Sequence, residues 1–193
     1  MFKNQSAEPA PNHREILEHI ARKVERADVL EGLHSADSAF AFAAHFHSSP
    51  GSYLWLCQSN REVERITRDL NFFLFCKNEQ RVLDIPNTEE NPYRGLSPHP
   101  SIASKRALSL WRLLRGHQGF VVTTLTSLAS RIPAPLDFLS HCIDLQIGKP
   151  FPLSNLIEDL WRIGYVNEDP VSGIGEFSNR GGIVDIFSPT HQN

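Results

Sequence analysis

Residues 52–57 read Ser-Tyr-Leu-Trp-Leu-Cys, a nearly continuous apolar run that begins just after the chain-breaking pair Pro50-Gly51. A short unbroken run of this kind is typical of a β-strand covered on both faces, as strands of parallel sheets are. A helical pattern follows, with apolar residues on one face at Val63, Ile66 and Leu70. A buried strand followed directly by an amphipathic helix is the unit from which α/β proteins are built.

The same alternation extends in both directions along the chain. Strands are expected at 29–30, 81–85 and 119–124. Helices are expected at 13–26, 101–114 and 126–131, and two further helices should begin near residues 35 and 60. The predicted N-caps are Ser35, Asn60 and Ser101, and Glu64 with Arg68 is a predicted surface ion pair. The fold class is therefore α/β, with a parallel sheet flanked by helices.

A joint is expected at Pro133-Ala134-Pro135, where the pattern changes. We assign residues 1–135 to the α/β domain and residues 136–193 to a partial α+β domain. In this second domain we expect helices at 136–142 and 152–162 and strands at 143–147, 176–179 and 183–187. Gly181-Gly182 joins the last two strands and suits a tight hairpin turn, in which both central positions can need positive φ.

Composition and charge exclude several classes of protein. The chain has 193 residues and a net charge of −3, but residues 136–193 hold three basic and eight acidic residues, a balance of −5. An acidic surface repels phosphate backbones, so this part favours protein contact over nucleic-acid binding. The three cysteines form no C-x-x-C pair, and no run is long enough to span a membrane, which favours a reduced cytoplasmic protein without a zinc site.

A nucleotide-binding loop is expected between the strand at 29–30 and the next helix, where the sequence reads GLHSADSA, residues 32–39. Phosphate loops follow the pattern G-x-x-x-x-G-K-[ST]. Counted from Gly32, Asp37 replaces the second glycine, Ser38 the lysine and Ala39 the hydroxyl residue. The groups that hold phosphate and magnesium are therefore missing, which predicts a degenerate loop that does not bind ATP. The plain reading is a turn capped by Ser35 or Asp37.

Two further segments carry candidate binding residues. The loop at 91–100 contains Tyr93, Arg94, Ser97 and His99, yet a serine two residues from a histidine on a proline-flanked loop does not define a catalytic pair. The predicted hairpin places Arg180 beside its glycine turn. From the residues alone, Arg180 is either a solvated turn arginine or a contact for a partner.

The hairpin sequence GEFSNRGGIVDIFSP strongly resembles the G-E-[FY]-x-x-R-G-x-[ILV]-[ILV]-[DE]-[IL]-F-P signature of UvrB and the bacterial transcription-repair coupling factor. Ser188 before the final proline is a departure of one residue. NPYRGLSPHPSIASKRALSLWRL and FVVTTLTSLASRIP resemble two further segments of the coupling factor. UvrB keeps a working phosphate loop where the coupling factor has lost it, so the resemblance is to the UvrB-like N-terminal region of the coupling-factor family, with a degenerate RecA-like domain.

The resemblance implies a role in transcription-coupled nucleotide excision repair, as a module that recruits UvrA to stalled RNA polymerase. It implies that Arg180 contacts UvrA, and that Glu176 and Phe177 either join it or only support the hairpin. No catalytic residue, cofactor or metal is expected here: ATP, magnesium, RNA polymerase and DNA would be bound by domains further downstream. The remaining alternatives are a fragment of a UvrB-like DNA helicase and a stand-alone UvrA-binding adaptor.

Overall fold

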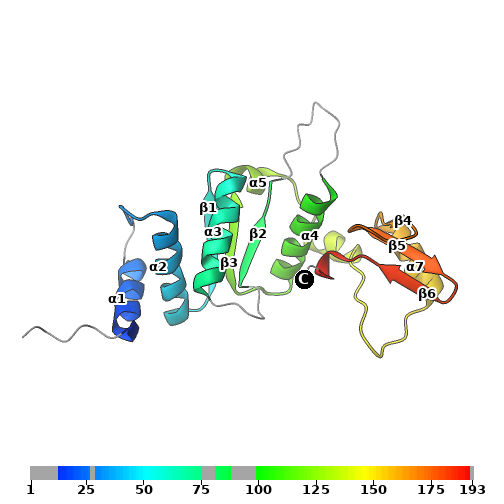
Figure 1. Ribbon diagram of the computed structural model, residues 1–193, viewed down its shortest axis with the longest axis horizontal. Helices are drawn as coiled ribbons and strands as arrows, with labels where there is room; N and C mark the ends of the chain where they lie inside the picture. Colours follow the sequence, from blue (N-terminus) through cyan, green and yellow to red (C-terminus); the bar gives the residue numbers. More distant parts are fainter. Residues whose placement is uncertain (1–12, 27–28, 75–80, 88–98, 192–193) are drawn as a thin grey trace, which may run out of the picture.

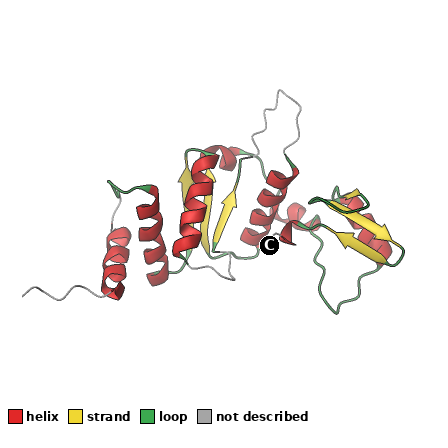
Figure 2. Cartoon of the chain, in the orientation of Figure 1, coloured by secondary structure: helices red, strands yellow, loops and turns green. Residues whose placement is uncertain are grey.

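A computed structural model describes residues 13–26, 29–74, 81–87 and 99–191. The first half contains α1 (His13–Arg26), α2 (Ser35–Ser48), β1 (Ser52–Cys57), α3 (Asn60–Phe73), β2 (Val82–Ile85), α4 (Pro100–Leu114), β3 (Gly119–Thr124) and α5 (Leu125–Ala129). The second contains α6 (Pro135–Ser140), α7 (Leu153–Arg162), β4 (Val166–Asn167), β5 (Glu176–Arg180), β6 (Ile183–Ile186) and the 3₁₀ turn η1 (Pro189–His191). The strands form two separate sheets (Figure 2).

The first sheet has the strand order β1-β3-β2, and all its pairs are parallel. This confirms the predicted α/β class. The sheet begins at a close backbone approach: the Phe120 amide donates to the Arg81 carbonyl at 2.7 Å. Gly119 has φ +145°, and a Cβ there would lie 2.1 Å from the same Arg81 oxygen. A glycine is therefore required where β3 enters the sheet.

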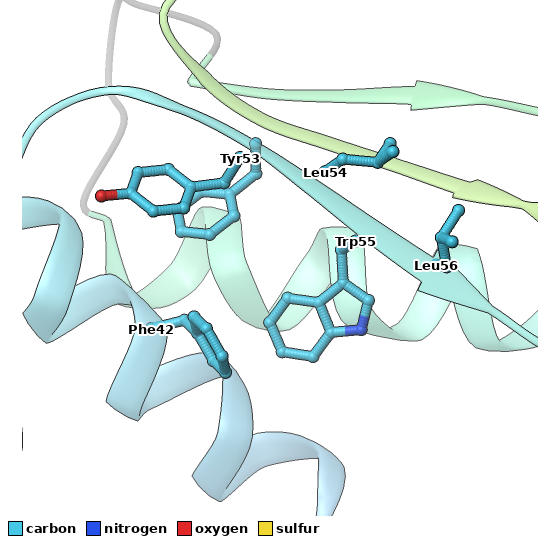
Figure 3. A pocket seen from close by; sticks show the side chains of 6 residues that line it. Phe42, Tyr53, Leu54, Trp55 and Leu56 are labelled. Carbon is cyan, nitrogen blue, oxygen red and sulfur yellow. The ribbon is translucent and has the colours of Figure 1, made fainter. Parts of the chain in front are cut away.

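One face of this sheet carries the main core. Helices α2 and α3 contribute small and aliphatic residues, and the strands contribute Cys57, Val82, Phe120 and Val122. Phe42 of α2 meets Trp55 of β1 edge-on, with ring centroids 5.0 Å apart. Figure 3 shows the two rings turned toward each other between the helix and the strand.

The prediction that 52–57 is covered on both faces is wrong. On the second face, Leu83 and Val121 are buried, but their neighbours Leu54 and Leu56 on β1 are 58% and 51% exposed. The reason is topological: β1 lies at one edge of the sheet, whereas α4 packs against β2 at the other edge. Figure 3 shows Leu54 and Leu56 pointing away from the side of β1 that Trp55 faces.

The predicted strand at Val29-Leu30 is absent, although both residues belong to the described chain. Val29 is 71% exposed, and none of the strands that the structure describes pairs with this segment. Two apolar residues are too few to form a ladder without a neighbouring strand. Helix α1 instead packs against α2, and the pair lies at one end of the molecule, beyond β1 (Figure 1).

The three predicted N-caps are each displaced by one or two residues. His34 precedes α2, Ser59 accepts from the Glu62 amide at the start of α3, and His99 accepts from the Ser101 amide at the start of α4. Each helix begins where a side chain can reach a free amide, and Pro100 suits the first helical position of α4 because it has no amide hydrogen. The Glu64–Arg68 ion pair does not form among the described residues.

The second sheet has the order β4-β5-β6, with β4 parallel and β6 antiparallel to β5. Leu156 and Leu160 of α7 pack with Phe177 of β5 to form its core. The predicted strand at 143–147 is not formed: no described strand lies beside it to complete a ladder, so its alternating apolar residues are not enough. After β6 the chain returns to the first half, where η1 contacts α4 (Figure 1).

Candidate protein-interaction site

The β5–β6 hairpin carries the candidate site. Arg180 and Ile183 pair across a two-residue turn made by Gly181 and Gly182. Gly181 has φ +65°, which an L side chain rarely adopts, whereas Gly182 has no such angle. The sequence therefore predicted the hairpin and its turn correctly, but one positive φ is found where two were allowed for.

Arg180 is exposed but not isolated. Its Nη2 donates to the Asp185 carboxylate, and the two side chains are 60% and 45% exposed. The hydrogen bond from Asp185 raises the pKa of Arg180 above its usual value, with the charges of Asp185 and Asp169 adding to the effect. A guanidinium has five donors, so the remaining N–H groups of Arg180 are available to a carboxylate on a partner.

Glu176 supports the loop that leads into the hairpin. Its Oε2 accepts from the Ser172 amide at 2.7 Å, the Gly173 amide at 2.8 Å and the Ser172 hydroxyl at 3.1 Å. These bonds favour the ionised form and lower the pKa of Glu176, the Ser172 amide contributing most. A carboxylate that is occupied in this way fixes loop 172–175 rather than reaching outward.

Phe177 lies beneath the hairpin and is fully buried. Trp161 of α7 meets its ring edge-on, at a centroid distance of 5.5 Å. The three residues singled out from the signature therefore share one strand but differ in exposure. Arg180 is presented to solvent, whereas the positions of Glu176 and Phe177 favour the supporting role that the resemblance left open for them.

The segment GLHSADSA forms a helix start and not a strand-to-helix loop. Gly32 has φ +74°, the Asp37 carboxylate accepts from the His34 amide at 3.2 Å, and the Ser38 hydroxyl donates to the His34 carbonyl at 3.0 Å. Ala39 is fully buried against the core. The predicted turn with Asp37 near the helix N-terminus is present, but Ser35 does not cap it, and α1 rather than a strand precedes it.

Most of the loop at 91–100 falls outside the described residues, including Tyr93, Arg94 and Ser97. His99 is described, and its Nδ1 lies 2.7 Å from the Ser101 hydroxyl at the start of α4. In this position His99 caps the N-terminus of α4.

A buried polar cluster at the end of β2 was not predicted. Arg106 of α4 is 8% exposed and donates to the Pro86 carbonyl at 3.1 Å and to the Ser127 carbonyl at 3.0 Å. The Ser127 hydroxyl lies 3.1 Å from the carbonyls of both Ile85 and Pro86, which share its single hydrogen. The only signal in the sequence was that Arg106 and Ser127 lie in the two segments that resemble the coupling factor.

The described residues offer little other chemistry. No group of three or more His, Cys, Asp or Glu side chains in them could hold a metal ion. Burial raises the pKa of Cys57 to about 11, so its thiol is protonated at neutral pH. An open hollow of about 270 Å³ along β1 is lined mainly by apolar side chains, as Figure 3 shows. Within the ranges that the structure describes, no helix is both long and apolar enough to cross a membrane.

The described hairpin presents an exposed arginine beside a glycine turn. The comparisons with known proteins bear on the domain that contains it. Residues 143–193, which include the hairpin, match the family described as the UvrB interaction domain. The chain is also 30% identical over 139 residues to the transcription-repair-coupling factor of Staphylococcus aureus, and 30% identical over 133 residues to that of Myxococcus xanthus.

The matches to the two coupling factors each cover 67% of this chain, but only 12% of the Staphylococcus aureus protein and 11% of the Myxococcus xanthus protein. The chain therefore spans a small part of the length of these relatives. The predicted resemblance to the coupling-factor family is confirmed, and residues 143–193 match the UvrB interaction domain.

Proposed function

We propose that this chain is a protein-interaction module of transcription-coupled nucleotide excision repair, which binds UvrA through the β5–β6 hairpin and has no ATPase activity of its own. The observation that carries the proposal is the exposed guanidinium of Arg180, held beside the Gly181-Gly182 turn within the segment that matches the UvrB interaction domain. Arginine is favoured at protein interfaces because its planar fork binds carboxylates in a fixed geometry.

The same proposal assigns the binding of ATP, RNA polymerase and DNA to other domains of a longer parent protein. In a longer parent, ATP and magnesium would be bound by a translocase part, and RNA polymerase and DNA by further domains. The helix start at Asp37, Ser38 and Ala39 supports this division, because it offers a carboxylate where a phosphate loop offers a lysine.

A calorimetric titration of the chain with UvrA tests the proposal. We expect binding, and we expect Arg180→Ala to weaken it by about thirtyfold, or ~2 kcal/mol. Arg180→Glu should be weaker still because it adds repulsion. Arg162→Ala is the matched control, since Arg162 is 62% exposed and also pairs with a carboxylate, that of Asp159. Equal binding by the wild type and Arg180→Glu would falsify the hairpin as the contact.

A further inference from the structure

Helix α3 presents an unusual outer face. Arg61, Arg65, Arg68 and Phe72 recur at i, i+4, i+7 and i+11, so they form one stripe along the helix. The buried residues of α3, Val63, Ile66 and Leu70, lie on the opposite side. The stripe is therefore the part of α3 that faces furthest from the core, and Arg61 to Arg68 spans about 10 Å. We call these four residues the α3 stripe.

The three arginines of the α3 stripe are exposed and uncommitted. None of them makes a hydrogen bond or an ion pair with any residue that the structure describes, although Glu64 stands one turn from Arg68. Phe72 ends the stripe and is 69% exposed. The Phe72 ring also meets Phe73 edge-on, at a centroid distance of 5.1 Å, which leaves most of its surface exposed. Arginine and aromatic residues are both enriched in protein interfaces.

The charges beside the α3 stripe limit what it can bind. Glu64 lies on one side of it, and Glu62 and Asp69 lie on the other, so the basic surface is only one stripe wide. A nucleic-acid duplex presents negative charge over a broad surface and would also meet these carboxylates. A narrow acidic ligand meets the arginines alone, and an apolar side chain on it can cover Phe72.

We propose that the α3 stripe is a docking surface for an acidic helix of a partner protein. Carboxylates one turn apart on that helix pair with Arg61, Arg65 and Arg68, and an apolar residue beyond them packs on Phe72. The surface belongs to the first sheet and its helices, whereas the hairpin belongs to the second sheet. The two proposals are independent, and neither needs the other to hold.

The probe for this surface is a fluorescein-labelled, alanine-rich helical peptide with glutamates at i, i+4 and i+7 and a leucine at i+11. Fluorescence anisotropy at low salt should show saturable binding to the chain, and a peptide with glutamines in place of the glutamates should not bind. We expect Arg65→Ala with Arg68→Ala to weaken binding about tenfold or more, and Phe72→Ala to weaken it severalfold.

The control is Arg22→Ala with Lys23→Ala, which removes the same charge from the exposed side of α1 and should leave binding unchanged. All replaced side chains are exposed, so each variant should keep the wild-type circular dichroism spectrum and thermal midpoint. The proposal is overturned if the glutamate peptide does not bind, or if the double arginine variant binds it as the wild type does. It is also overturned if a DNA duplex binds more tightly and loses its binding in that variant, because the surface is then a phosphate site.

Discussion

Arg180 and Asp185 face each other diagonally across the β5–β6 hairpin, and the guanidinium of the first donates to the carboxylate of the second. Arg180 pairs with Ile183 in the ladder, and Asp185 pairs with Ser178, so the ion pair spans the Asn179–Val184 rung that lies between them. The contact orients the arginine beside the turn while leaving it exposed. It also places a competing carboxylate next to any acidic group that a partner brings.

This competition leads to a prediction for Asp185. Asp185→Asn removes the negative charge but keeps the size of the side chain, so Arg180 becomes free to pair with a partner carboxylate. We expect the variant to bind UvrA at least as tightly as the wild type in the same titration. Its thermal midpoint should change little, because exposed ion pairs contribute about 0–1 kcal/mol to folding. A loss of binding as large as that of Arg180→Ala would show instead that Asp185 itself is part of the contact.

Glu176 should make the stability of the chain depend on pH. Its pKa is lowered in the folded state by the Ser172 and Gly173 amides, relative to an ordinary value of 4.5. The stabilisation is therefore complete above that ordinary value and is lost as the pH falls through the lower folded pKa. We expect Glu176→Gln to lower the thermal midpoint at pH 7 and the difference from wild type to shrink below about pH 4. A difference that stays constant from pH 7 to pH 3 would contradict this role.

Arg106 should be important for folding. Truncation to alanine leaves the carbonyls of Pro86 and Ser127 without this donor in a buried site. We expect Arg106→Ala to reduce the free energy of unfolding by about 3 kcal/mol in urea titrations. Arg106→Lys should recover only part of this loss because an ammonium cannot reproduce the planar fork. Arg131→Ala, at an exposed position, is the control and should be near neutral.

Mg-ATP should not bind. The turn before α2 uses the Asp37 carboxylate to accept the His34 amide and contains no lysine, so nothing in it neutralises a triphosphate. Calorimetry with millimolar Mg-ATP should record no heat of binding. A dissociation constant in the micromolar range would favour the helicase alternative over an interaction module.

Duplex DNA should be retained weakly at most by this chain. Residues 136–193, which contain the hairpin, have a net charge of −5, and the α3 stripe lies between carboxylates. In a gel-shift titration at physiological salt we expect no nanomolar complex. Tight, salt-sensitive retention of DNA would contradict both the charge argument and the choice of an acidic protein as ligand for the α3 stripe.

The sequence by itself determined most elements and the hairpin. The runs at 52–57 and 119–124 are strands, the helical pattern from His13 to Arg26 is a helix, and Gly181-Gly182 makes the turn that places Arg180. These features depend on local pattern and backbone freedom, which short-range sequence expresses directly. The family signature could also be recognised from the sequence alone, because its residues are contiguous in the chain.

The tertiary structure decided what depends on neighbours. Val29-Leu30 and residues 143–147 carry strand-like patterns, but no strand in the described part of the chain pairs with them. Leu54 and Leu56 are exposed because β1 lies at a sheet edge. Only the fold brings Arg106 to Ser127 and pairs Arg180 with Asp185. Hydrogen-bond ladders, burial and ion pairs join residues that are apart in the sequence, so their outcome depends on which surfaces the fold places together.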